Sequence, residues 1–200
     1  IMQRLLLQAI KEAAESGISN VVMVLAPGMG DSLYLPLKEA LDVSIVPHIE
    51  LSYVEQLDPI GLGDAILQSE SEVGQEPFAV LLPDDVVRER TGRSSQLRVL
   101  QRMMGAFAEL KDAYLVAVTS VPKSRMSHCG VAKVASREAL PEIRTVRELV
   151  EKPEPAHPIL RSTRATGIVG RYLLRPDIFT ALREIKDAGG RPVHLTAALD

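Results

Sequence analysis

The sequence predicts an α/β fold, because amphipathic helical patterns alternate with short runs of buried-strand character. Apolar residues recur at spacings of three and four over residues 5–14, which predicts a helix that ends at Gly17. The continuous apolar run over residues 21–26 then predicts a strand covered on both faces. A turn over residues 27–30 ends this strand.

The helix and strand pair recurs twice. Asp64 is predicted to cap a helix that continues to about residue 73, and residues 78–82 form a second buried run. A third helix is expected to begin at residue 94 or 95, and a third buried strand follows over residues 114–118. Repeated pairs of this kind are typical of helices packed on a central sheet.

Shorter strands are expected beyond residue 122, which indicates a mixed region of the sheet. Their predicted positions are residues 130–135, 146–150 and 167–174, with a proline-containing loop before the last of them. A final helix over residues 176–188 begins at a favourable proline and ends before a pair of glycines.

Composition favours one ordinary globular domain that acts on small molecules. The 200 residues are 46% hydrophobic and carry a formal net charge of −3, with lysine and arginine spread along the chain. We therefore expect no nucleic-acid partner and no membrane partner. The single cysteine, Cys129, excludes an intrachain disulfide framework and favours a reducing, cytoplasmic location.

Ligands of open α/β sheets collect outside the C-terminal ends of strands, and three segments are candidates for such a site. In the first, Gln56 could read a pyrimidine edge through its donor and acceptor atoms. Gly61 and Gly63 stand just before a predicted helix and would let the backbone approach a base or phosphate closely. A glycine turn before a helix is also an ordinary structural feature.

The second candidate segment is the pair Asp84 and Asp85 at the end of the 78–82 strand. Carboxylate oxygens in this position could hold Mg2+ that bridges phosphate oxygens. A polar turn or a helix cap is the alternative.

The third candidate segment is Glu151 and Lys152, which precede a proline. Glu151 could accept hydrogen bonds from sugar hydroxyls, and Lys152 could meet a phosphate charge. Adjacent strand residues point to opposite faces unless a bend re-aims them, so an exposed charge pair is the alternative interpretation.

The order of these segments resembles that of the sugar nucleotidyltransferase family, in particular its bacterial UTP:glucose-1-phosphate uridylyltransferases. The resemblance covers most of the chain. It rests on Gln56 followed by Gly61-Leu62-Gly63-Asp64-Ala65, the strand Pro77 to Asp85, Cys129-Gly130-Val131, Val150-Glu151-Lys152-Pro153, and Gly167 to Tyr172.

The resemblance implies a three-layer α/β/α nucleotidyltransferase fold with a mixed, mostly parallel central sheet. It also implies uridylyl transfer from UTP to glucose 1-phosphate, which gives UDP-glucose and pyrophosphate. The implied site comprises Gln56, Gly61 and Gly63 at uracil, Gly130, Glu151 and Gly167 at glucose, Lys152 at the sugar phosphate, and Asp84 at Mg2+. Asp84 and Lys152 would be the catalytic pair.

The sequence also departs from the family pattern. We expect one domain over residues 1–200 that lacks the family's N-terminal glycine-rich loop and its C-terminal strand, which bears a second metal-binding aspartate. Asp64 replaces a usual histidine, and alanine follows Leu195-Thr196 where the family usually has aspartate. We favour part of a complete enzyme, expected to be a homo-oligomer. The alternatives are an inactive binding or assembly module and a transferase for another nucleotide and sugar phosphate.

Overall fold

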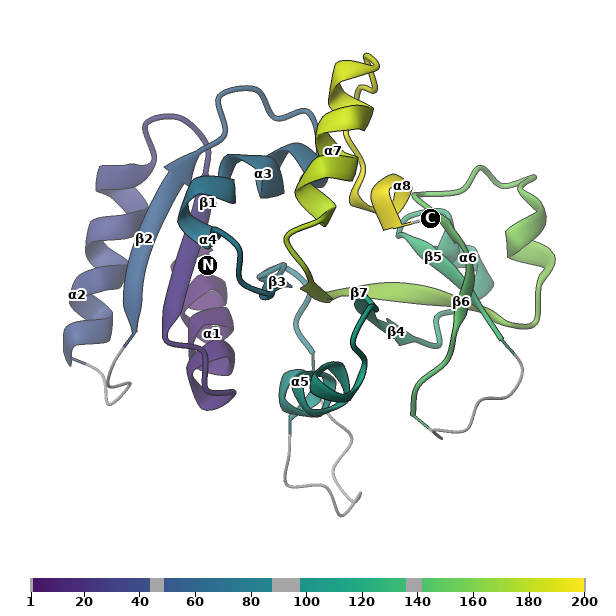
Figure 1. The fold of residues 1–200 in the computed structure, drawn as a ribbon, viewed down its shortest axis with the longest axis horizontal. Coiled ribbons are helices and arrows are strands. Elements are labelled where there is room, and N and C mark those ends of the chain that lie inside the picture. Colours follow the sequence, from purple (N-terminus) through teal and green to yellow (C-terminus); the bar gives the residue numbers. More distant parts are fainter. Residues whose placement is uncertain (1, 44–48, 88–97, 136–141, 200) are drawn as a thin grey trace.

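The computed structural model describes residues 2–43, 49–87, 98–135 and 142–199 (Figure 1). Its first elements follow the expected order, with helix α1 (Met2–Glu15) before strand β1 (Asn20–Leu25). Gly17 lies between them with a φ of 87°, in the left-handed region that glycine adopts easily. Glycine at this position therefore ends α1, as the sequence predicted.

The described strands form two sheets. In the first, β1 pairs in parallel with β2 (Glu50–Glu55). The second has five strands, in which β7 pairs with three others and β6 pairs with β5. Its members are β3 (Phe78–Leu81), β4 (Leu115–Thr119), β5 (Val131–Val134), β6 (Val146–Val150) and β7 (Ala165–Leu174).

The expectation of a mostly parallel sheet is wrong for the described residues. The α/β class is confirmed. The parallel pair among the described strands, β1 with β2, lies in a separate sheet, whereas β3, β4 and β5 all pair antiparallel to β7, and β6 pairs antiparallel to β5. Residues of β3 and β4 are apolar because helices lie on both faces of the sheet and shield these strands from water. This cover does not depend on strand direction, so an apolar run does not report whether its neighbours are parallel.

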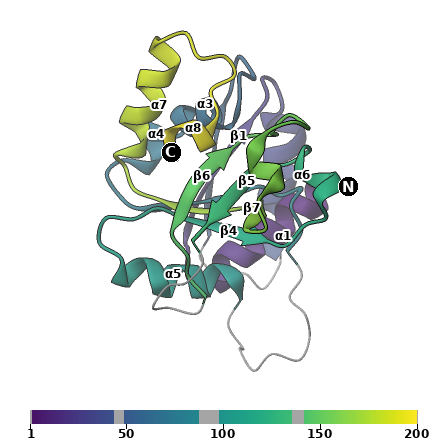
Figure 2. The same ribbon diagram turned by 90° about the vertical axis from the view of Figure 1, so that its right-hand side faces the viewer.

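Helices lie on both sides of the strands, as expected for three layers (Figure 2). On one side are α3 (Leu62–Gln68), α4 (Glu70–Val73), α7 (Ile178–Asp187) and α8 (Leu195–Leu199). On the other are α1 and α5 (Val99–Glu109), and α5 contacts both β4 and β7. The predicted start of the third helix, at residue 94 or 95, lies outside the described residues.

The remaining helical segments connect these layers. They are a π-helical turn (Gly30–Tyr34), α2 (Leu35–Val43), α6 (Lys123–Met126) and a 3-10 turn (Pro158–Arg161). The region expected as one helix to residue 73 is divided, because α3 ends at Gln68 and α4 begins at Glu70. None of the helices in the described ranges is both long enough and apolar enough to cross a membrane.

The main hydrophobic core joins β7 to α7, α3 and the segment before α8. Phe179 and Leu182 of α7 pack with Leu174 of β7, and all three are almost completely buried. Phe179 also stacks on Phe78 of β3, with ring centroids 5.2 Å apart. Side chains of this size stabilise a fold by roughly 1.5–3 kcal/mol each when buried. The core therefore holds α3 and α7 firmly over the strand ends.

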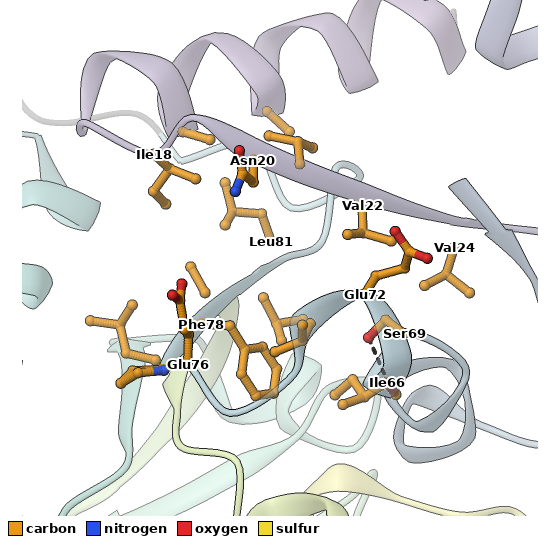
Figure 3. Close-up of a pocket in the computed structure, with 18 of the residues that line it drawn as sticks. Ile18, Asn20, Val22, Val24, Ile66, Ser69, Glu72, Glu76, Phe78 and Leu81 are labelled. Atoms are coloured by element: carbon orange, nitrogen blue, oxygen red, sulfur yellow. Dashed lines mark hydrogen bonds between the residues drawn. The ribbon is translucent and has the colours of Figure 1, made fainter. Parts of the chain in front are cut away.

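A cavity of about 890 Å³ lies between β1 and β3. Figure 3 shows Asn20, Val22 and Val24 of β1 and Phe78 and Leu81 of β3 among the residues that line it. Helices α1 and α5 contribute to one side of the cavity, and α3 and α4 to the other. Among the described strands, β1 pairs only with β2 and β3 only with β7, so each presents an unpaired edge to this cavity.

Candidate functional site

The Gln56–Gly61 segment connects β2 to α3. Gln56 directly follows β2 and is half-buried, and its side-chain Nε2 donates to the carbonyl oxygen of Gly61 at 3.2 Å. Gly61 has a φ of 119°, and a Cβ atom there would meet the Val193 carbonyl oxygen at 2.4 Å. Only glycine fits this position, which holds the entrance of α3 against the segment before α8.

Gly63 has a different environment from Gly61. It is buried in the first turn of α3, and its backbone N–H donates to the Val193 carbonyl oxygen at 2.9 Å. A Cβ atom at this position would lie 2.6 Å from a methyl group of Leu182. This geometry favours a packing role for Gly63 over the predicted contact with a base.

Asp64 is not the helix cap that the sequence predicted. Gly61 occupies the cap position, and Asp64 lies inside the first turn of α3 with 2% of its surface exposed. Its carboxylate accepts hydrogen bonds from Lys186 of α7 at 2.7 Å and from Gln56 at 2.8 Å. Burial by itself would raise the pKa of Asp64, but the hydrogen bonds from Lys186 and Gln56 and the charge of Lys186 lower it below its ordinary value.

The two aspartates after β3 have different environments. Asp85 Oδ2 accepts a hydrogen bond from the backbone N–H of Gly170 at 2.8 Å, which ties the exit of β3 to β7. Asp84 is exposed. Within the described ranges, no three His, Cys, Asp or Glu side chains gather as a ready-made metal site. Asp84 therefore fits one carboxylate ligand of a cation whose other ligands come from substrate or water.

Gly130, Glu151 and Gly167 gather at one end of β5, β6 and β7. A Cβ atom on Gly130 would lie 3.2 Å from Glu151 Oε2 and 2.9 Å from Ile168 Cδ1. The Gly130 carbonyl oxygen accepts from the Ile168 N–H at 2.8 Å, so Gly130 lies directly beside β7. Gly167 pairs across the sheet with Val131, the residue after Gly130. Three predicted sugar contacts thus come together from separate parts of the chain.

Glu151 and Lys152 form a bend after the end of β6. Lys152 has a φ of 42°, a left-handed backbone conformation that is uncommon outside glycine. The bend interrupts the strict alternation of side chains along a strand. As expected from the sequence, Glu151 and Lys152 need such a bend if they are not to point to opposite faces. Lys152 is exposed, and Glu151 is half-buried. Unusual backbone conformations of this kind concentrate at functional sites.

The carboxylates of Glu151 and Asp85 both affect the pKa of two side chains, Cys129 and Tyr172. Burial raises the pKa of the Cys129 thiol, and the negative charges of Glu151 and Asp85 raise it further. Burial likewise raises the pKa of the Tyr172 hydroxyl, with added contributions from the same two carboxylates. The strand end that carries Asp84 and Asp85 therefore lies in the same electrostatic neighbourhood as Glu151.

Helix α8 lies between the two halves of the candidate site (Figure 1), because it contacts both α3, which follows Gly61, and β6, which precedes Glu151. Ile168, the neighbour of Gly130, packs against the same hydrophobic cluster as Ile60 and Leu62. The segment at Gln56 and the segment at Gly130 and Glu151 thus border common elements.

Several contributors to the site are not among the residues of the site that the family resemblance implied. Asp85 stood in a candidate segment, and its adjacency to Asp84 was the available signal. Lys186 and Val193 gave no signal, because their contacts with Asp64 and Gly61 join residues more than 120 positions apart. Tyr172 stood at the end of the Gly167 to Tyr172 segment of the resemblance, and in the structure it belongs to the main hydrophobic core.

A family model with the description "Nucleotidyl transferase" matches residues 1–199. The chain belongs to the nucleotidyl transferase family. This membership agrees with the fold that the sequence led us to expect.

Relatives in the nucleotidyl transferase family include the UTP–glucose-1-phosphate uridylyltransferase 2 of Streptococcus pyogenes serotype M3. It is 34% identical over 152 residues, which are 76% of this chain and 48% of that protein. UTP–glucose-1-phosphate uridylyltransferase YngB of Bacillus subtilis is 29% identical and matches 95% of this chain and 65% of its own length. The chain spans about half to two thirds of the length of these curated relatives.

Solved structures of nucleotidyl transferases superpose on nearly the whole chain. A UDP-glucose pyrophosphorylase complexed with UDP-glucose has a TM-score of 0.79 and 30% identity, over 98% of this chain and 73% of that one. The UTP-bound UGPase from Acinetobacter baumannii has a TM-score of 0.74 and 26% identity, over 98% and 70% of the respective chains.

Proposed function

We propose that the whole protein transfers a uridylyl group from UTP to glucose 1-phosphate, giving UDP-glucose and pyrophosphate. The observation that carries this proposal is the gathering of Gly130, Glu151 and Gly167 at one sheet end, with α8 between them and the Gln56–Gly61 segment. The printed names of the relatives, UTP–glucose-1-phosphate uridylyltransferases, support the choice of substrates.

In this proposal each half of the site binds one part of UDP-glucose. Gln56 and the backbone at Gly61 hold uracil, and Gly63 supports that turn. Glu151 accepts from sugar hydroxyls, while the backbone at Gly130 and Gly167 borders the sugar, at two positions where a side chain would collide with its neighbours. A phosphate oxygen of glucose 1-phosphate attacks the α-phosphorus of UTP, and the bond to the pyrophosphate oxygen breaks. Lys152 orients the sugar phosphate and offsets its charge, so the protein acts by positioning and by electrostatic stabilisation.

Asp84 is the residue of the described chain that would hold Mg2+. A divalent cation bound there would neutralise charge on the phosphate oxygens during transfer. Asp85 stays bonded to Gly170, so its part is to fix the turn that presents Asp84. Asp84 and Lys152 remain the proposed catalytic pair.

We further propose that residues 1–200 are one domain that is completed by segments outside this sequence. The cavity between the unpaired edges of β1 and β3 supports this proposal, since it has strand edges on two sides and helices above and below. A strand inserted there would join the two sheets and satisfy both edges. The glycine-rich loop and the C-terminal strand of the family would belong to the same completed protein.

The remaining partners follow from composition. We propose a cytoplasmic homo-oligomer without nucleic-acid or membrane partners. The single cysteine supports the cytoplasmic location, and the dispersed charges support the absence of nucleic-acid and membrane partners. The exposed side chains of Leu57 and Tyr53 offer apolar surface for assembly.

Pyrophosphate release by the complete protein tests the proposed reaction. UTP with glucose 1-phosphate is expected to be the preferred pair among common nucleoside triphosphates and sugar phosphates, in a reaction that requires Mg2+. Lys152→Ala should weaken transition-state binding by about 1.5–3 kcal/mol, through loss of a charge-assisted phosphate contact. Lys133→Ala is the matched control, because Lys133 lies in β5 and pairs with Glu148. Equal effects of the two substitutions would remove Lys152 from the site.

Two alternatives have distinct outcomes in the same assays. Preferential turnover of a thymidine, guanosine or cytidine nucleotide would assign a sister activity. Binding of UDP-glucose by the complete protein without any turnover would assign a non-catalytic binding module, which the departures at Asp64 and Ala197 would then explain.

A further inference from the structure

The buried carboxylate of Asp64 is surrounded by donors from three other positions. Lys186 Nζ donates to Oδ1 at 2.7 Å, Gln68 Nε2 donates to Oδ1 at 3.4 Å, and Gln56 Nε2 donates to Oδ2 at 2.8 Å. The side chain of Asp64 is 3% exposed, while that of Lys186 is 41% exposed. A carboxylate this deeply buried needs such partners to stay charged.

These contacts fix the orientation of the Gln56 side-chain amide. Nε2 carries two hydrogens, and its two acceptors are Asp64 Oδ2 and the Gly61 carbonyl oxygen. Neither a carboxylate nor a carbonyl oxygen can donate. If the amide were turned by 180°, its own oxygen would face both acceptors, which is unfavourable. Gln56 therefore keeps Oε1, which can only accept, on the side opposite to Asp64.

We propose that Asp64 is a positioning residue that sets base specificity by holding Gln56 as a hydrogen-bond acceptor. This inference rests on the proposed function, in which Gln56 meets the base of the nucleotide. An acceptor at that place complements the N3–H of uracil or thymine. The ring N3 of cytosine has a lone pair instead of a hydrogen, so two acceptors would face each other. Asp64 thus favours uridine over cytidine nucleotides without touching either.

Lys186 completes this arrangement by supplying the positive charge that offsets the buried Asp64 carboxylate. It reaches Asp64 from α7, which packs against α3, and so ties the base-reading segment to the main core. Removing the lysine leaves a buried carboxylate without its cation, which loosens the contact with Gln56. The expected effect has the same direction as loss of Asp64 but is smaller, because Gln68 and Gln56 still donate.

Binding of UDP-glucose and CDP-glucose to the complete protein, measured by calorimetry, tests the specificity. Asp64→Asn can present an amide hydrogen to Gln56 and so permits the turned amide. The ratio of UDP-glucose to CDP-glucose affinity should fall by about tenfold or more, and Lys186→Met should lower it less. Glu70→Gln is the control, because Glu70 of α4 pairs with Arg183 of α7 at an exposed position, and it should leave the ratio unchanged. An unchanged ratio in Asp64→Asn would overturn the proposal.

The side-chain amide of Gln56 gives a readout that does not depend on the nucleotide. In the ligand-free protein, both amide protons of Gln56 should exchange slowly with solvent in NMR spectra, and Asp64→Asn should shift their resonances and speed their exchange. Fast exchange in the wild-type protein would overturn the positioning role even if UDP-glucose binds. Slow exchange together with no preference for UDP-glucose over CDP-glucose would support the hydrogen bond between Gln56 and Asp64 but overturn the proposed specificity. That result would also count against the proposed function itself.

Discussion

The guanidinium of Arg171 on β7 donates two hydrogen bonds to the Glu12 carboxylate on α1, at 3.0 and 2.8 Å. The same guanidinium donates to the carbonyl oxygens of Leu82 and Gly170. Arg171 is 3% exposed, so the pair is shielded from water. One buried ion pair therefore fixes α1, β7 and the exit of β3, the segment that carries Asp84.

Arg171→Met is expected to lower the free energy of unfolding by about 3–5 kcal/mol, since it leaves the Glu12 carboxylate buried without a partner. Urea denaturation measures this change. The matched control is Arg183→Met, which removes the exposed pair with Glu70 and should cost about 0–1 kcal/mol. Equal losses of unfolding free energy for the two substitutions would show that the pair of Arg171 and Glu12 stabilises the fold no more than an exposed ion pair does.

Gly130→Ala tests the close packing in the sugar half of the site. The added methyl group would lie 2.9 Å from Ile168 Cδ1 and 3.2 Å from Glu151 Oε2, so both side chains must move. Crowding of this kind costs about 1–3 kcal/mol, and UDP-glucose binding should weaken by about tenfold. Gly105→Ala is the control, because α5 has open space there and the change should stabilise the helix by about 0.5–1 kcal/mol. UDP-glucose affinity unaffected by Gly130→Ala would place the sugar elsewhere.

The lowered pKa of Asp64 predicts how stability depends on pH. Its folded-state pKa lies below the ordinary value of 3.8, so the charged form contributes stability that is fully present above this pH. That contribution is lost as the pH falls through the folded-state pKa. The difference in unfolding free energy between wild type and Asp64→Asn should therefore be constant at neutral pH and shrink under acid conditions. A difference that grows on acidification would contradict the assigned interactions.

Cys129 should react slowly with thiol reagents at neutral pH. Burial, followed by the charges of Glu151 and Asp85, raises its pKa above the ordinary value of 9.0, so less thiolate is present than in a free cysteine. The rate of alkylation should keep rising above pH 9.0, and Glu151→Gln should shift this profile to lower pH. Glu148→Gln, which changes a β6 carboxylate paired with Lys133, should leave the profile unchanged. Identical profiles for the two variants would separate Glu151 from Cys129.

Periodicity and apolar runs were sufficient to locate most elements of the fold. α1, β1 and β3 occur where they were predicted, because helical spacing and continuous apolar runs directly reflect burial. β2 was not predicted, since its sequence has no continuous apolar run, none of its residues is fully buried, and Tyr53 is 39% exposed. α2 was also not predicted, because Pro36 in its first turn resembles a break in the chain.

Two properties of the fold could not be predicted from local sequence patterns: the direction of strand pairing and the contacts between residues far apart in the chain. Antiparallel pairing of β3 and β4 with β7 depends on the path of the chain between them, which local apolar patterns do not report. Asp64 resembled a cap because an acidic residue before a helical pattern usually is one. Its actual partner, Lys186, is 122 residues away, and no local pattern links the two positions.

The central claim is that the segments at Gln56 and at Gly130 and Glu151 line one cleft, and titration with UDP-glucose followed by backbone amide NMR tests it most directly. The amide resonances of Gly61, Gly130 and Glu151 should shift together along one binding curve. Perturbation of only one of these segments, or of residues around the β1–β3 cavity instead, would contradict the claim.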